Sequence, residues 1–139
     1  MTTANLLLDT GALISLLDRS QREHERFVAC FEAWSGAVVT TEAVLTEATH
    51  LLSRVPGGAV ACLDFVLAGG AAVVPASQGS LARCRELIAR YADLPMDFAD
   101  ATLVVLAEEI GSYSVCTTDR RDFTVYRAAG RQRFRIVPE

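Results

Sequence analysis

The chain has 139 residues and a net charge of −4 at neutral pH, and 51% of its residues are hydrophobic. This length is enough for one hydrophobic core and too short for two ordinary domains, so we expect a single domain over residues 1–139. The sequence has no run of about 18 apolar residues that could span a membrane, and no basic segment precedes the first apolar run. We therefore expect a cytoplasmic protein that has no membrane partner.

The first predicted element is a buried strand of three leucines, residues 6–8, which ends at Asp9. Thr10 and Gly11 then lead into a short helix that reaches residue 17. An acid at the carboxyl end of a strand lies where open α/β sheets bind their ligands. Asp9 is also placed to cap the helix, and that role is compatible with catalysis.

Three elements follow: an amphipathic helix over residues 21–35, a strand over residues 37–40 and a helix over residues 41–55. His24 lies on the charged side of the first helix, and we expect it to be solvated. Thr41 is placed to cap the second helix, and Glu42 in its first turn is explained by the helix dipole. Glu47 lies in the middle of that helix beside apolar neighbours, so it is the better functional candidate.

A break at residues 56–58 separates this helix from another apolar helix over residues 59–68, and the two helices form a hairpin. The hairpin has more apolar residues than one helical face can bury: Val44, Leu45, Leu51, Leu52, Val55, Val60, Leu63, Phe65, Val66 and Leu67. One interpretation is a groove for a partner chain that docks as a helix. The other interpretation, which stays open, is that these residues belong to the core or to the seam of a homodimer.

The next elements are a strand over residues 71–74, a helix over residues 80–94 capped by Ser80, and a helix between Asp97 and Gly111. The last of these is apolar nearly all round, so it must be buried. Asp97 is placed to cap it, and Asp100 lies three residues later on the same face of its first turn. Two acids therefore open one buried helix.

The remaining elements are a short buried strand over residues 113–116 and a final strand over residues 134–137. The first of these strands delivers Thr117, Thr118 and Asp119 to its carboxyl end, and Asp122 follows closely. Between residues 120 and 135 there are six arginines and one acid, so this end of the chain is strongly basic. The cysteines, Cys30, Cys62, Cys84 and Cys116, have no close partners in the sequence, and we expect buried apolar residues rather than a zinc site or disulfides.

The alternation of strands and helices predicts an α/β fold with a mostly parallel sheet of four to five strands, flanked by helices. Right-handed crossovers place the carboxyl ends of parallel strands at one edge of the sheet. Asp9 and Asp119 therefore share that edge with Glu47 and Asp100. Carboxylates that are gathered in this way repel one another, so we expect a compensating cation.

A set of carboxylates without histidine or cysteine at ligand spacing is an oxygen-only site, which suits Mg²⁺ or Mn²⁺. Such ions support the hydrolysis of phosphodiesters by activating water and stabilising the charged transition state. The sequence has no glycine-rich phosphate loop, so a polymer of phosphodiesters is a better substrate than a nucleoside triphosphate. Its backbone contacts are expected among six residues, whose alternative is a solvated face: Arg120, Arg121, Arg127, Arg131, Arg133 and Arg135.

Four acidic blocks carry a family resemblance: LLLDTGALISLL, TTEAVLTEATHLL, LPMDFADATLVVLAEEIG and CTTDRRDF. In this order and spacing they resemble the PIN-domain nucleases, and the length resembles the VapC-type toxins of bacterial toxin–antitoxin pairs. The resemblance implies a three-layer PIN-like sandwich. It also implies a Mg²⁺- or Mn²⁺-dependent ribonuclease that forms a homodimer and is inhibited by a small cognate antitoxin protein.

Carried over by position, the resemblance makes Asp9, Glu47, Asp100 and Asp119 the catalytic acids. Asp9, Asp100 and Asp119 would bind the metal, and the accessory residues would be Asp97, Thr118 and Asp122. Two other readings remain. The chain could be a catalytically weak PIN-like module that binds RNA or protein, or an α/β scaffold whose acids are only caps and ion-pair partners.

Overall fold

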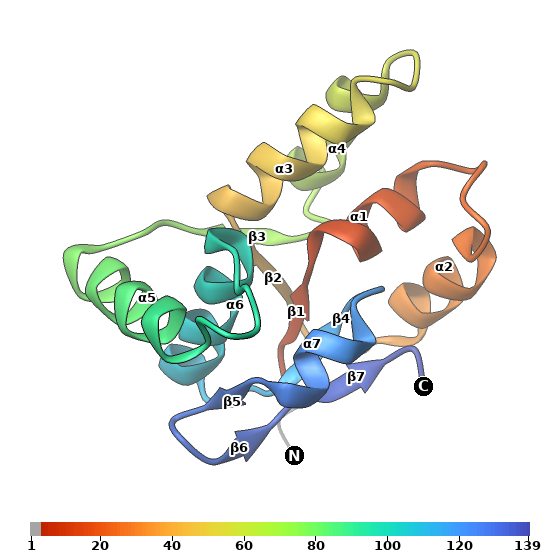
Figure 1. Ribbon diagram of the computed structural model, residues 1–139. Coiled ribbons are helices and arrows are strands. Elements are labelled where there is room, and N and C mark those ends of the chain that lie inside the picture. Colours follow the sequence, from red (N-terminus) through yellow and green to blue (C-terminus); the bar gives the residue numbers. More distant parts are fainter. Residues whose placement is uncertain (1–3) are drawn as a thin grey trace.

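The computed structural model describes residues 4–139, and its centre is a five-stranded sheet (Figure 1). The strands are β1 (Leu6–Leu8), β2 (Val38–Thr41), β3 (Ala72–Val74), β4 (Ser114–Cys116) and β7 (Arg135–Val137). Their order is β3-β2-β1-β4-β7, and every neighbouring pair is parallel. The predicted α/β fold with four to five mostly parallel strands is confirmed.

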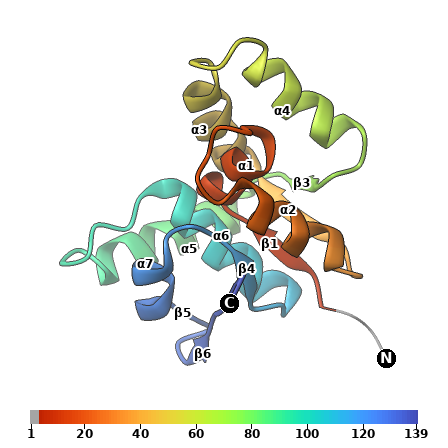
Figure 2. The same cartoon turned by 90° about the vertical axis from the view of Figure 1, so that its right-hand side faces the viewer.

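Helices cover both faces of the sheet. They are α1 (Thr10–Leu17), α2 (His24–Ala33), α3 (Glu42–Leu52), α4 (Gly58–Leu67), α5 (Gln78–Arg90), α6 (Phe98–Ile110) and α7 (Arg120–Val125). Helices α1 and α2 lie on one side and α5 and α6 on the other, because the strand order reverses direction after β3 (Figures 1 and 2). Helices α3 and α4 form the predicted hairpin, which packs on α1 and projects from the rest of the molecule (Figure 1).

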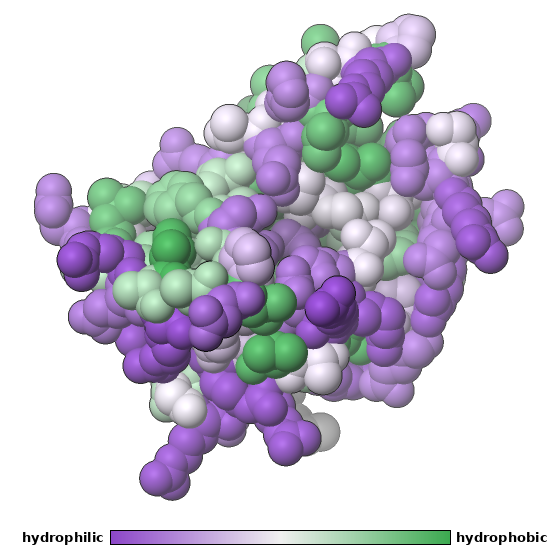
Figure 3. Space-filling view, in the orientation of Figure 1, coloured by the Kyte–Doolittle hydropathy of each residue, from purple (hydrophilic) through white to green (hydrophobic). Residues whose placement is uncertain are grey.

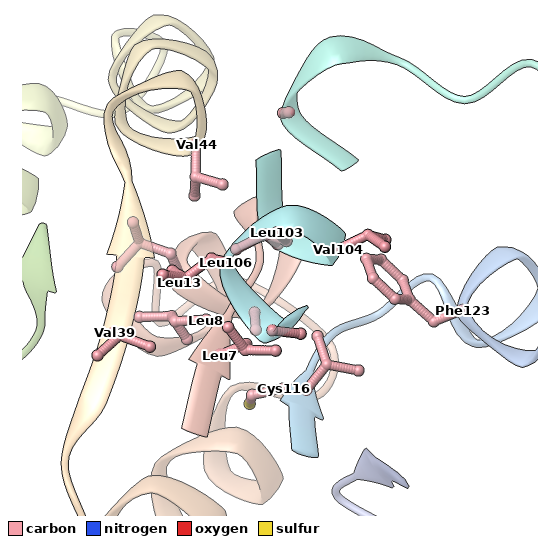
Figure 4. Packing of buried hydrophobic residues seen from close by; sticks show 14 of the residues in the cluster. Leu7, Leu8, Leu13, Val39, Val44, Leu103, Val104, Leu106, Cys116 and Phe123 are labelled. Atoms are coloured by element: carbon pink, nitrogen blue, oxygen red, sulfur yellow. The ribbon is translucent and has the colours of Figure 1, made fainter. Parts of the chain in front are cut away.

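The core lies between β1 and α6. Leu6, Leu7 and Leu8 are fully buried because β1 is the middle strand and has helices on both faces. Figure 4 shows Leu103 and Val104 of α6 in the same cluster as Leu7 and Leu8. Burial of one such side chain contributes about 1.5–3 kcal/mol. This packing holds the first turn of α6 at a set distance from the end of β1.

Three predicted helix ends are confirmed. Thr41 accepts a hydrogen bond from the Val44 N–H and caps α3, Asp97 accepts one from the Asp100 N–H and caps α6, and Gly111 ends α6 with a positive φ of 66°. The prediction that Ser80 caps α5 was wrong by one turn. Ser77 is the cap, and Ser80 returns a bond to the Ser77 N–H in a reciprocal capping box.

The segment between Asp119 and the last strand has more structure than was predicted. Helix α7 is followed by an antiparallel hairpin of β5 (Arg127–Ala128) and β6 (Gln132–Arg133). Phe123 and Tyr126 are fully buried, and Phe123 stacks edge to face on both Tyr126 and Phe134. A helix of six residues is too short for its period to be visible in the sequence, and these aromatic contacts hold it in place.

The cysteines are free thiols: Cys62, Cys84 and Cys116 are buried and Cys30 is half-buried. This confirms their expected role as apolar packing residues. Among residues 4–139, the structure has no helix that is both long enough and apolar enough to cross a membrane.

Candidate metal centre

Three aspartates gather at the carboxyl edge of the sheet. One carboxylate oxygen from each of Asp100, Asp119 and Asp122 lies within 4.8 Å of the other two. Asp100 comes from the first turn of α6, Asp119 is the N-cap of α7, and Asp122 is in the first turn of α7. The short helix α7 therefore brings Asp122, which the sequence placed among accessory residues, into the centre of the group.

Asp9 stands beside this group at the end of β1 and is buried. Its Oδ2 accepts a hydrogen bond of 2.6 Å from the Thr117 hydroxyl, and the Thr117 Oγ1 accepts one of 2.9 Å from the Asp119 N–H. Thr117 thus joins Asp9 to Asp119. Sequence reasoning missed this residue and named Thr118, which is exposed and rests against Gly11. The sequence held no signal for this choice, because Thr117 lies opposite Asp9 only through the register of β1 on β4.

Another hydrogen bond orients Asp100 within this group. The Tyr126 hydroxyl donates to Asp100 Oδ2 at 3.0 Å, and the ring of Tyr126 is fully buried. Burial and the nearby Asp100 carboxylate raise the pKa of Tyr126, so this hydroxyl keeps its proton and remains a donor. The Asp100 side chain is therefore held in one orientation toward the other carboxylates.

The environment makes it costly for all of these acids to be charged together. Burial, opposed by the hydrogen bond from Thr117, raises the pKa of Asp9 to about 6. Burial, together with the charges of Asp9 and Asp97, raises the pKa of Asp100 to about 8. Burial also raises the pKa of Asp119. A bound cation would remove this cost, because it favours the charged forms.

The residues present fit a hard divalent cation. The three atoms that could bind a metal ion are all carboxylate oxygens. Such ligands suit Mg²⁺ or Mn²⁺ better than a metal that prefers thiol or imidazole ligands. Thr117 and Tyr126 provide the outer hydrogen bonds that usually orient metal-binding carboxylates. The Thr10 hydroxyl, next to Asp9, is buried and has no hydrogen-bond partner within residues 4–139. Such a group fits a site that takes up a polar ligand.

The other predicted acids lie at the margin. Asp97 is exposed and serves as the cap of α6, but its charge contributes to the raised pKa of both Asp9 and Asp100. Glu47 is exposed on α3, and it is not part of the three-carboxylate group. A buried position among apolar residues is therefore not found for Glu47.

Comparison with known proteins identifies the family. Residues 6–129 match the family model described as PIN domain. The chain belongs to the PIN-domain family. This PIN domain is 29% identical over 135 residues to Ribonuclease VapC26 of Mycobacterium tuberculosis, and the alignment covers 96% of this chain and 100% of that protein. The resemblance read from the four acidic blocks is confirmed.

Three solved structures share the fold. The structure of Mycobacterium tuberculosis VapC20, a toxin that cleaves the sarcin-ricin loop, matches with a TM-score of 0.73 at 22% identity. The match covers 79% of this chain and 86% of the VapC20 chain. VapBC2 from Rickettsia felis, bound to a promoter DNA fragment, has a TM-score of 0.68 at 14% identity, with 95% and 98% covered. A toxin–antitoxin complex from Klebsiella pneumoniae has a TM-score of 0.64 at 20% identity, with 86% and 91% covered.

The six arginines between residues 120 and 135 of this PIN domain fall into two groups. Arg120 donates to the Pro138 carbonyl, Arg127 donates to three carbonyls at the end of α7, and Arg135 pairs with Glu139. These three are engaged in the structure of the domain. The other group is exposed and has no bonded partner within the described part of the chain: Arg121, Arg131 and Arg133.

Proposed function

We propose that this single-domain PIN protein is a divalent-metal-dependent endoribonuclease and the toxin of a toxin–antitoxin pair. The observation that carries the proposal is the convergence of Asp100, Asp119 and Asp122 beside the buried Asp9. The similarity to a protein named as a ribonuclease, and to structures described as toxins, supports the same function.

The metal would be held by Asp9, Asp100 and Asp119, and Asp122 lies close enough to join them. Mg²⁺ or Mn²⁺ bound there would polarise a phosphodiester and activate water for its hydrolysis. Thr117 orients Asp9 and Asp119 together, and Tyr126 orients Asp100. These hydrogen bonds preorganise the carboxylates before substrate arrives, which lowers the cost of forming the charged site. We keep Glu47 as a catalytic candidate, but not as a ligand of the metal.

The substrate would be RNA held by its phosphates. Arg121 lies on α7 next to Asp122, while Arg131 and Arg133 lie on the β5–β6 hairpin. An arginine without an intramolecular partner can pair with phosphate at no cost of breaking another bond. We therefore assign the backbone contact to these three, because Arg120 is partly engaged through its bond to the Pro138 carbonyl.

The inhibitory partner would be a small antitoxin protein that docks on the α3–α4 hairpin. Val44 and Leu52 of α3 are buried in the core, whereas Val60, Leu63 and Leu67 of α4 are 64%, 48% and 84% exposed. Their spacing places them along one side of α4, and Figure 3 shows this projecting lobe with apolar side chains on its surface. An amphipathic helix is the natural occupant of such a row. The similar structure from Klebsiella pneumoniae is described as a toxin–antitoxin complex, and the one from Rickettsia felis as VapBC2 bound to promoter DNA.

A second copy of the chain would use a different surface. Leu81, Ile88 and Phe98 are exposed around α5, beside a mostly apolar hollow between α3, β3, α5 and α6. Its lining includes the start of α3 but no residue of α4, so a homodimer there would leave the exposed row of α4 available to an antitoxin. Sedimentation of the chain alone tests the homodimer.

One cleavage assay tests the proposed activity. A mixed RNA pool is incubated with the protein in Mg²⁺, in Mn²⁺ and with EDTA, and Asp119→Asn serves as the inactive control. We expect cleavage with at least one ion and none with EDTA or with the variant. RNA that is bound but never cut with either ion would instead identify a catalytically weak binding module.

A further inference from the structure

The turn between α1 and α2 is a built element rather than a loose connection. Asp18, which is only 8% exposed, accepts hydrogen bonds from the Ser20 N–H at 2.9 Å, the Ser20 hydroxyl at 2.7 Å and the Gln21 side-chain amide at 3.1 Å. One carboxylate therefore holds the start of the turn. The residues that follow are presented to solvent in a defined conformation.

The other end of the turn is also held. His24 Nδ1 lies 2.8 Å from the Ser15 carbonyl oxygen, which can only accept, so this ring nitrogen carries a hydrogen and donates it. The His24 N–H donates to the Gln21 carbonyl at 3.1 Å. The expectation that His24 is simply solvated was therefore wrong, because its ring closes the turn against α1.

A hollow of about 380 Å³ lies between this turn and the residues that follow β4. It is lined by Ser15, Gln21, Arg22, Glu23 and Thr118. Thr118 stands between Thr117, which binds Asp9, and Asp119 of the three-carboxylate group. A Cβ on Gly11 would overlap the Thr118 hydroxyl, so only glycine there allows this close approach to α1. The hollow therefore adjoins the candidate metal centre.

The charge around the hollow is positive where it is not compensated. Glu23 is paired with Arg26 at 3.0 Å, so its carboxylate is already occupied. Arg22 lines the hollow, is exposed and has no side-chain partner within residues 4–139, whereas Arg19 and the equally unpaired Glu25 line the neighbouring hollow. A preorganised turn that presents one unpaired guanidinium beside a hydroxyl is suited to bind a phosphate.

We propose that the α1–α2 turn is a second backbone clamp for the RNA, in which Arg22 and Thr118 contact a phosphate that flanks the one being cut and Arg19 assists. This inference rests on the proposed ribonuclease function. In the view of Figure 1, α7 lies between the β5–β6 hairpin and α2, so the α1–α2 turn is a separate part of the surface from the hairpin that carries Arg133. Phosphates are repelled by the carboxylates themselves, and a second contact at the turn helps to hold the strand near them. Phosphate contacts of this kind orient the RNA without reading its bases.

The test compares Arg22→Gln with Arg54→Gln, which removes the same charge from an exposed arginine in the turn after α3, outside the lining of the hollow. Cleavage kinetics are measured in Mg²⁺ over a series of salt concentrations. For Arg22→Gln we expect kcat close to wild type and a KM raised about two- to fivefold, as for the loss of one exposed ion pair. The slope of log kcat/KM against log salt should become shallower by about 0.7, the value for one phosphate contact on a single strand. Arg54→Gln should match the wild type.

Other outcomes separate the two proposals. If the wild type cuts no RNA with either ion, both the proposed ribonuclease function and the proposed clamp are rejected. A wild type that cuts RNA, with Arg22→Gln and Arg54→Gln indistinguishable in KM and salt slope, overturns the clamp alone. If Arg22→Gln also lowers the Tm, Arg22→Lys decides, because lysine keeps the charge. It must restore the wild-type salt slope, and failure to do so rejects the contact.

Discussion

The Thr117 hydroxyl donates a hydrogen bond of 2.6 Å to the Asp9 carboxylate across the ends of two neighbouring parallel strands. The same oxygen accepts from the Asp119 N–H, which can only donate, so the direction of both bonds is set. Thr117 is 1% exposed, and water cannot replace it. Two candidate metal ligands from distant parts of the chain therefore share one fixed contact.

Thr117→Val should remove this contact while keeping the shape of the side chain. It leaves the buried Asp9 carboxylate without its donor, which costs about 1–3 kcal/mol when Asp9 is ionised. We expect lower stability in urea unfolding above about pH 7, where Asp9 with its pKa of about 6 is charged, and reduced RNA cleavage. Thr117→Ser keeps the hydroxyl and should recover most of both. A valine variant as active as the wild type would show that the contact has no part in the site.

Asp100→Asn should abolish cleavage and stabilise the protein in EDTA. The substitution removes a carboxyl group that burial and the neighbouring charges make costly to ionise, while the amide oxygen can still accept from the Tyr126 hydroxyl. Differential scanning calorimetry in EDTA measures the change in Tm. Asp64→Asn, which removes an exposed charge on α4, is the matched control and should leave Tm nearly unchanged. A lower Tm for Asp100→Asn would mean that repulsion does not govern this cluster.

The metal-free protein should lose stability as the pH rises from about 4 to about 8. The pKa values of Asp9 and Asp100 are raised from 3.8 to about 6 and about 8, so in this range the folded state binds more protons than the unfolded state. The slope of the unfolding free energy against pH is then negative, about 1.4 kcal/mol per pH unit for each proton. Urea unfolding in EDTA at several pH values measures it. The Asp100→Asn variant should have a shallower slope, and equal slopes would contradict the assignment.

Mg²⁺ or Mn²⁺ should raise the Tm of the wild type, since a ligand at 100 times its Kd stabilises the folded state by about 2.7 kcal/mol. Asp119→Asn and Asp122→Asn should reduce this shift, because both carboxylates belong to the three-oxygen group. Glu47→Gln should retain it, because Glu47 is exposed and outside that group. A shift that depends on Glu47 and not on Asp122 would reverse the ligand assignment.

Antitoxin binding should protect α4 from hydrogen exchange. The exposed row of Val60, Leu63 and Leu67 would become covered, whereas the buried α6 is already protected in the free chain. Exchange is followed with and without the product of the neighbouring gene. Replacing the three residues with serine should weaken binding and leave RNA cleavage intact. Protection confined to α5 would move the docking site to the other apolar surface.

Local patterns were sufficient for most of the fold and for the general position of the site. The leucine run of β1, the apolar period of α6, the Asp97 cap and the Gly111 stop depend on neighbouring residues, so they can be read along the chain. The parallel arrangement followed from the alternation of strands and helices, and it brought Asp9, Asp100 and Asp119 to one edge. Each of these inferences needs only short-range periodicity and the handedness of crossovers.

The individual contacts were decided by the tertiary structure. Thr117, rather than Thr118, meets Asp9 because the register of β1 on β4 pairs Leu8 with Cys116. Asp122 joins the carboxylates because the aromatic packing of Phe123 holds the short helix α7 in place. Long-range contacts also select which arginines are engaged and which are free, as with Arg120 and the Pro138 carbonyl. A sequence pattern specifies which face a side chain occupies, but the distance between two side chains from remote segments depends on register and packing, which arise only when the whole core assembles.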